Sequence, residues 1–214
     1  MYDTIVIGGG VSGIMAATAA SLNNNKVLLI EKNKKLGKKL LISGGGRCNV
    51  TNRLPYEEII QNIPGNGKFL YGPFSIFDNE SIINFVESNG VNLKEEDHGR
   101  MFPVSNKAKD VLNVFLEQLE QNKVDIHFET EVAEILTEAD KITGVKTMNG
   151  TTYNARNVIV TTGGKSVPQT GSTGDGHKFA KSLGHTVTDL FPTEVPITSN
   201  QRFFSDGSLK GISL

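Results

Sequence analysis

Hydrophobic residues near the start of the chain fall into two short runs separated by a segment of small residues. Residues 4–7 are a short run rich in β-branched side chains, and residues 26–30 are apolar after Lys26, which predicts two buried strands. Residues 11–22 between them include four alanines, a composition typical of a helix that packs closely on a sheet. Strand, helix and strand in about 30 residues predict a parallel βαβ unit.

Helical and strand-like patterns alternate along the rest of the chain. Residues 79–88 and 106–121 carry apolar stripes of helical spacing, and residues 174–183 predict a further helix. Residues 131–154 predict a small β-meander with tight turns, and residues 157–161 predict another buried strand. We therefore expect an α/β fold, a Rossmann-like domain with a parallel sheet and a small meander.

The pattern changes after residue 191. Short polar segments follow, with a further proline and a pair of phenylalanines. This change predicts that residues 1–191 form the first domain and that residues 192–214 begin a second, mostly β domain.

Composition and charge exclude several classes of protein. The 214 residues are 37% apolar and 21% charged, as in ordinary soluble proteins, and a net charge of −1 gives no overall attraction to nucleic acid or anionic lipid. No apolar run approaches the roughly 20 residues of a membrane span, and the first residues do not resemble a signal peptide. A single cysteine and scattered histidines give no metal-ligand pattern. We expect a cytoplasmic protein with no metal and no membrane partner, and nucleic acid is not a favoured partner.

The strongest chemical signal directly follows the first predicted strand. Residues 8–13, Gly-Gly-Gly-Val-Ser-Gly, match the dinucleotide-binding pattern G-x-G-x-x-G. In that pattern Gly8 allows a tight turn, Gly10 lets a pyrophosphate approach, and Gly13 lets the helix pack closely. Glu31 ends the second predicted strand, where its carboxylate would bind ribose hydroxyls and repel the 2′-phosphate of NADP. The alternative is a glycine-rich turn without a ligand.

Two further polar segments are candidates for contact with the same ligand. Residues 26–47 carry seven cations, of which we expect Lys32 or Lys39 to contact the cofactor and the rest to be solvated. Residues 43–49 contain three consecutive glycines, which allow backbone to approach an anion or a flat ring. Arg47 could pair with a phosphate or a reduced ring, but a flexible surface loop explains this segment equally well.

These motifs together resemble the two-dinucleotide-binding flavoproteins, and more narrowly the BaiN / aminoacetone-oxidase-like family of bacterial FAD-dependent oxidoreductases. The matching segments are residues 2–13, 43–52, 99–103 and 162–176. The resemblance implies a glutathione-reductase-type fold with FAD as cofactor. The contacts that it implies for the ADP half of FAD are Gly8, Gly10, Val11, Ser12, Gly13 and Glu31. Those implied along the pyrophosphate and towards the flavin are Gly45, Gly46, Arg47, Cys48, Asn49, Thr162, Gly163, Asp175 and Gly176, with Val132 beside the adenine. From the residues alone, Cys48 is favoured as a packed thiol.

The resemblance also implies redox chemistry with a small-molecule substrate. Hydride would pass between NAD(P)H or a small organic substrate and FAD, and then to an organic acceptor or dioxygen. Members of that family are longer, so the C-terminal return that completes the FAD domain is missing here. The resemblance implies no catalytic acid or base among these residues, because substrate contacts would come mostly from the missing half. A missing C-terminal half or a complementing chain is therefore an expected partner. The alternatives are an inactive, non-catalytic FAD-binding fragment and a FAD-dependent tRNA-modification protein, which the near-neutral charge disfavours.

Overall fold

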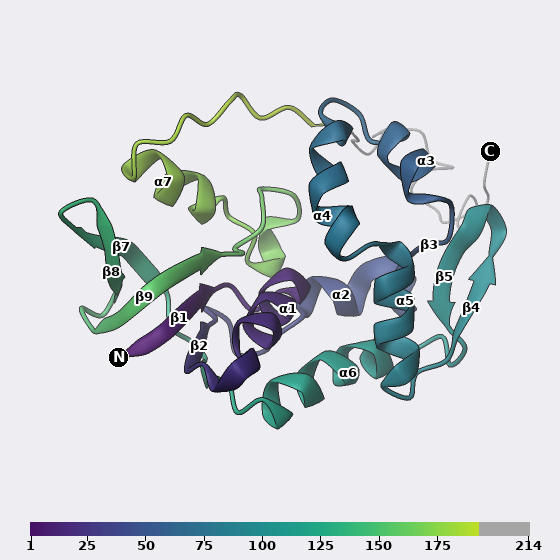
Figure 1. Cartoon of the computed structure of the whole chain (residues 1–214), viewed down its shortest axis with the longest axis horizontal. Helices are drawn as coiled ribbons and strands as arrows, with labels where there is room; N and C mark the ends of the chain where they lie inside the picture. Colours follow the sequence, from purple (N-terminus) through teal and green to yellow (C-terminus); the bar gives the residue numbers. More distant parts are fainter. Residues whose placement is uncertain (193–214) are drawn as a thin grey trace, which may run out of the picture.

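Two β-sheets organise residues 1–192, which are the residues that the computed structural model describes (Figure 1). The larger sheet has the strand order β6-β2-β1-β9-β8-β7, and the smaller has the order β3-β5-β4. The strands are β1 (Tyr2–Ile7), β2 (Val27–Ile30), β3 (Thr51–Asn52), β4 (Leu93–Glu96), β5 (Arg100–Pro103), β6 (Asp125–His127), β7 (Val132–Glu138), β8 (Lys141–Thr147) and β9 (Thr152–Val160). The helices are α1 (Val11–Ala20), α2 (Lys38–Ile42), α3 (Tyr56–Gln61), α4 (Tyr71–Ile76), α5 (Asn79–Ser88), α6 (Ala108–Gln121) and α7 (Asp175–Ser182). The predicted second domain lies outside the described residues except for its first residue, and it stays a prediction.

The centre of the larger sheet is parallel, as the βαβ pattern predicts. β1 pairs in parallel with β2 on one side and with β9 on the other, and β6 extends the parallel set beyond β2. Ile5, Val6, Leu28 and Leu29 are fully buried because layers cover both faces of these strands. The expected Rossmann-like α/β fold is confirmed.

Alternate side chains of β1 and β2 enter two separate cores. Val6 and Leu29 pack with residues of α1 and α6, whereas Ile5 and Leu28 pack with the meander and with Phe179 of α7. This division follows from the strand geometry, because successive side chains point to opposite faces. The helices α1 and α6 therefore cover one face, and the meander with α7 covers the other.

The strand β9 corrects the expectation for residues 157–161. The sequence predicts a meander strand followed by a separate buried strand, but one nine-residue strand serves both purposes. Its first half pairs antiparallel with β8, and its second half pairs in parallel with β1. Within residues 1–192 no strand pairs with the other edge of residues 156–160, so Val160 is 39% exposed rather than buried.

Several short elements between residues 38 and 103 carry no clear periodic signal in the sequence. They are α2, α3, α4 and the three-stranded sheet, which lies on the far side of α2 and α5 from the larger sheet (Figure 1). Residues 43–46, expected to be irregular, form a distorted 3₁₀ turn in which Gly44 and Gly45 have positive φ. Short elements of this kind depend on tertiary packing more than on local pattern.

Candidate functional site

A cleft of about 450 Å3 opens at the carboxyl ends of β1 and β2, where α1 begins. Ile7 and Ile30, the last residues of the two strands, line it, and Thr161 lies just beyond the end of β9 on the same edge. Ligands of open α/β sheets bind outside the carboxyl ends of the strands. The cleft is therefore in the position where this fold places a nucleotide.

The glycine turn that opens α1 has the geometry expected of a phosphate cradle. Gly8 has φ +105°, and a Cβ on Gly13 would overlap the carbonyl oxygen of Gly8. A Cβ on Gly10 would meet nothing within 4 Å. Gly10 begins the helix without a side-chain hydrogen bond, so the first amides of α1 are left to a ligand or to solvent. Val11 and Ser12 line the cleft at this point, and the positive end of the helix favours an anion there.

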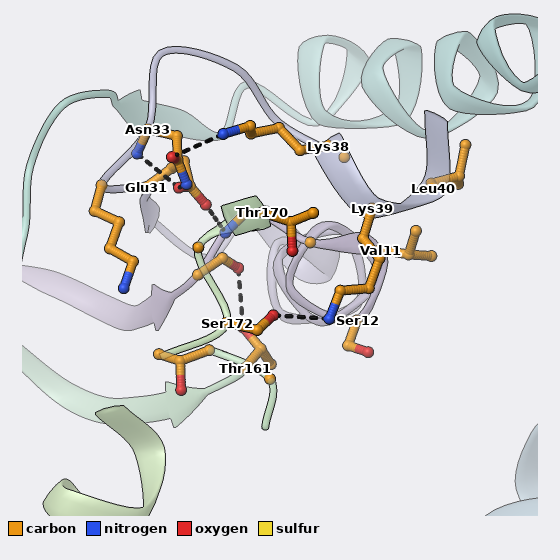
Figure 2. A pocket seen from close by; sticks show the side chains of 18 of the residues that line it. Val11, Ser12, Glu31, Asn33, Lys38, Lys39, Leu40, Thr161, Thr170 and Ser172 are labelled. Carbon is orange, nitrogen blue, oxygen red and sulfur yellow. Dashed lines mark hydrogen bonds between the residues drawn. The ribbon is translucent and has the colours of Figure 1, made fainter. Parts of the chain in front are cut away.

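Glu31 is buried directly after β2, and Figure 2 shows its side chain beside Asn33. Its Oε2 accepts a hydrogen bond of 2.7 Å from the amide of Gly9, and its Oε1 accepts one of 2.7 Å from the amide of Asn33. The side-chain amide of Asn33 also donates to Oε1. A carboxylate has about four acceptor positions, and these three hydrogen bonds leave about one, on Oε2, for a ligand.

Lys32 and Lys39 both line the cleft, and both hold the loop that precedes α7. Lys32 Nζ lies 2.7 Å from Asp175 Oδ2 and donates to the hydroxyl of Thr173 at 2.6 Å. Lys39 Nζ donates to the hydroxyl of Ser172 at 2.9 Å (Figure 2). The burial of Asp175 acts to raise its pKa, but hydrogen bonds from Lys32 and Thr173 outweigh it and leave the pKa below its ordinary value. Both ammonium groups thus lie at the cleft, Lys32 paired with the Asp175 carboxylate and Lys39 hydrogen-bonded to the Ser172 hydroxyl.

Most of the remaining predicted contacts also meet at the cleft. Val132, Thr162, Gly163 and Asp175 line it. Gly176 does not, but it lines a second, neighbouring hollow, and its amide donates to Thr162 Oγ1 at 2.9 Å. Gly13 contacts the glycine turn from inside the fold, in the packing role that the sequence pattern predicts.

The glycine segment at residues 43–49 divides between the cleft and the small sheet. Cys48 and Asn49 line the cleft, whereas Gly45, Gly46 and Arg47 do not. The guanidinium of Arg47 pairs instead with the carboxylate of Glu96. Burial raises the pKa of the Cys48 thiol, although a hydrogen bond with Ser43 acts in the other direction. This favours the packed thiol over a reactive one.

The match to known families covers almost the entire chain. Residues 2–213 match the family described as the HI0933-like protein Rossmann domain. The chain belongs to this family. The resemblance drawn from the sequence motifs is confirmed, and the chain carries the Rossmann-type FAD-binding fold of an oxidoreductase family.

Two curated relatives of this HI0933-like chain have related but different names. The ribosomal RNA dihydrouridine synthase of Escherichia coli is 30% identical over 197 residues, which are 92% of this chain and 48% of that protein. The 3-dehydro-bile acid delta(4,6)-reductase of Clostridium scindens is 31% identical over 202 residues, which are 94% of this chain and 48% of that protein. The chain thus spans about half the length of these relatives.

Among solved structures, the open conformation of a flavocytochrome c3 fumarate reductase superposes with a TM-score of 0.65. It is 19% identical, and the match covers 86% of this chain and 40% of that one. At this identity the likeness supports the fold alone.

No helix among residues 1–192 is long and apolar enough to cross a membrane.

Several residues that line or support the cleft of this HI0933-like chain were not predicted from the sequence. Asn33 holds the Glu31 carboxylate, and Lys38 Nζ in turn lies 3.2 Å from Asn33 Oδ1 (Figure 2). Thr170 and Ser172 reach the cleft from a loop about 140 positions beyond Glu31. The proximity of Asn33 to Glu31 is a local signal, but nothing in the sequence indicates that the distant loop would lie there.

The residues present fit an extended adenine dinucleotide such as FAD. The free amides at the start of α1 and the ammonium of Lys39 can hold the phosphates, and Glu31 can accept a hydrogen bond from a ribose hydroxyl. Backbone at Val132 lies at the same cleft, where the family resemblance expects the adenine.

Proposed function

We propose that this chain is the FAD-binding part of an oxidoreductase that takes electrons from NAD(P)H or from an organic substrate. The observation that carries the proposal is that the glycine turn at the start of α1 and the Glu31 carboxylate face one cleft. A turn without a ligand would not need both an open approach at Gly10 and a buried carboxylate beside it. Bound FAD would supply hydride transfer to an organic acceptor or to dioxygen.

In this proposal each part of the cleft has one task. The amides of Val11 and Ser12, with Lys39, bind the pyrophosphate, and Glu31 orients the adenosine ribose. Asn33 fixes the orientation of Glu31 through two hydrogen bonds. These groups position the cofactor, while the contacts that select the substrate lie outside the described residues.

The names of the two curated relatives support a narrower proposal for the acceptor. Dihydrouridine differs from uridine by the reduction of a carbon–carbon double bond, and a delta(4,6)-reductase likewise acts on carbon–carbon double bonds. We therefore propose that the full-length protein reduces a carbon–carbon double bond next to a carbonyl group. A small organic molecule is the first candidate, because a net charge of −1 offers no general attraction to RNA.

RNA is the second candidate, because the relative from Escherichia coli is named for ribosomal RNA. The two candidates predict different behaviour. A small-molecule reductase would oxidise NADH or NADPH in the presence of an unsaturated ketone and would ignore RNA. An RNA enzyme would bind RNA with an affinity that falls steeply with salt, and would form dihydrouridine in it.

The cofactor is tested first on the purified 214-residue chain. We expect a flavin absorption spectrum, and we expect FAD rather than FMN in the solution released by heat. Glu31→Gln should weaken FAD binding about tenfold or more, because a charged acceptor of hydrogen bonds is lost. Glu117→Gln on the exposed face of α6 is the matched control and should bind like the wild type. A folded chain that takes up no added FAD would overturn the proposal.

Turnover distinguishes an enzyme from a fragment that only binds FAD. Sustained oxidation of NADH or NADPH by the flavin-loaded chain would exclude the non-catalytic alternative. If FAD binds without turnover, addition of the C-terminal half as a separate chain should restore activity. We propose such a complementing segment as a partner, because β9 leaves one edge of residues 156–160 unpaired within residues 1–192.

A further inference from the structure

The segment of residues 43–49, which we call the glycine loop, lines the cleft with Ser43, Cys48 and Asn49 and has an unusual backbone. Gly44, Gly45 and Gly46 have φ values of +54°, +66° and +87°, and Cys48 has φ +63°. A positive φ is costly for a residue with a side chain, and it persists only where the surroundings impose it. Cys48 is nevertheless buried and lines the cleft. Something must therefore hold the glycine loop in this shape.

The contacts of Arg47 supply that constraint. Its guanidinium lies over the ring of Phe102 with 4.2 Å to the ring centroid, and its Nε donates to Asn106 Oδ1 at 3.0 Å. Its Nη2 donates to the carboxylate of Glu96. Glu96 and Phe102 belong to β4 and β5, so the side chain next to Cys48 is held by the small sheet and not by the cleft.

The same sheet also contacts the backbone of the loop on both sides of Arg47. A Cβ on Gly44 would lie 3.1 Å from the Phe102 ring, so this glycine packs directly against it. The amide of Val50, just after the loop, donates to the carbonyl of Met101 at 2.8 Å. The small sheet thus holds the segment at three points, at Gly44, at Arg47 and at Val50 directly after the loop.

We infer that Glu96 is a positioning residue for the cofactor, which acts through Arg47 to hold the glycine loop as a wall of the cleft. The inference rests on the proposed function, since it takes the cleft as the FAD site. Glu96 balances the charge of Arg47 and fixes the plane of the guanidinium on Phe102. Arg47 is then occupied in holding the loop and does not serve as a counter-ion for a phosphate.

Lys94 also forms an ion pair with Glu96, but it does not replace Arg47. Lys94 Nζ lies 3.2 Å from Glu96 Oε1, but Lys94 has no hydrogen bond to the loop. The pKa of Glu96 is below its ordinary value, mainly because Arg47 donates to it, which agrees with the direct pairing of the two side chains.

The first test needs no flavin, because Cys48 is the single cysteine of the chain and reports on the loop. In the wild type its buried thiol should react slowly with a disulfide reagent under native conditions. Glu96→Gln and Arg47→Lys should each raise the rate about tenfold or more, with little change in the circular dichroism. Asp97→Asn is the matched control, because it removes a neighbouring carboxylate–guanidinium pair, that with Arg100. The Arg100 guanidinium lies farther from the Phe102 centroid than that of Arg47, at 5.7 Å against 4.2 Å, and it donates to Asp97 and not to the loop.

The second test measures FAD binding to the same variants. We expect Glu96→Gln to weaken binding about tenfold and to change the near-ultraviolet dichroism of the bound flavin, whereas Asp97→Asn should change neither. In an Arg47→Met background Glu96→Gln should have no further effect, because the two residues act as one unit.

The outcomes separate this inference from the proposed function. Wild-type thiol protection and wild-type FAD binding in both Glu96→Gln and Arg47→Lys would overturn the inference while FAD binding by the cleft stands. Equal effects of Glu96→Gln and Asp97→Asn would also overturn it, because they would indicate general loosening of the sheet. A wild type without FAD binding would overturn the proposed function, and the thiol test would still show whether Glu96 holds the loop.

Discussion

Gly10 and Gly13 stand three positions apart in the glycine turn, yet they serve different purposes. A Cβ on Gly13 would collide with the backbone of Gly8, whereas a Cβ on Gly10 would enter open space at the cleft. A side chain at position 13 should therefore lower the stability of the fold, whereas a side chain at position 10 should interfere with ligand binding.

We expect Gly13→Ala to lower the free energy of unfolding by about 1–3 kcal/mol, because α1 must move away from the turn. Gly10→Ala should change it by less than about 0.5 kcal/mol, because a poorer helix cap is offset by a less flexible unfolded chain. Gly10→Ala should nevertheless weaken FAD binding. Urea unfolding and flavin titration of both variants check this, and an equal loss of stability in both would contradict it.

Asp175 makes the contact between Lys32 and α7 dependent on pH. Its pKa in the folded protein is lowered, so its contribution to stability is complete above the ordinary carboxylate range and is lost as the pH falls through the lowered value. The melting temperature of the wild type should exceed that of Asp175→Asn at neutral pH, and the difference should shrink in acid. Asp189→Asn changes an exposed residue and is the control, and its melting temperature should equal that of the wild type at both neutral and acid pH.

At the scale of elements, α6 connects the core to the cleft. Its Phe115 is buried and also lines the cleft, and its ring centroid lies 5.6 Å from the ring centroid of Phe85 on α5. The apolar stripe that predicts this helix from the sequence is the face that is buried.

We expect Phe115→Ala to cost about 3–5 kcal/mol of unfolding free energy, because it leaves a large cavity beneath α1 and α5. Asn113→Ala on the exposed face of the same helix should stay within about 0.5 kcal/mol of the wild type. Denaturant unfolding measures both values. A small effect of Phe115→Ala would mean that the neighbouring helices close the cavity.

For the whole molecule, one edge of residues 156–160 in β9 has no strand partner within residues 1–192, and we expect association with other chains there. Val160 is exposed at the end of β9, where the strand pairs with β1 on one edge only, whereas the first residues of β9 pair with β8. Unpaired apolar strand edges are sites of association.

The isolated chain should therefore associate increasingly as its concentration rises. Val160→Lys should reduce this association, because a charge on an edge strand opposes pairing. Met148→Lys replaces an apolar residue that is more exposed than Val160, 68% against 39%, but lies away from this edge, and it should leave association unchanged. Light scattering coupled to size exclusion measures the mass. A wild type that stays monomeric at every concentration would contradict the prediction.

The local sequence by itself determined the βαβ unit, the glycine turn, Glu31 and α6, because each depends on a pattern within a few turns of chain. Tertiary structure alone decided that β9 joins the meander to the parallel sheet and that Thr170 and Ser172 reach Lys39 and the cleft. It also placed Arg47 against Glu96 and Phe102, 49 and 55 positions away along the chain, instead of at the cleft. Such contacts depend on where distant segments meet in the folded chain, and no local periodicity records that.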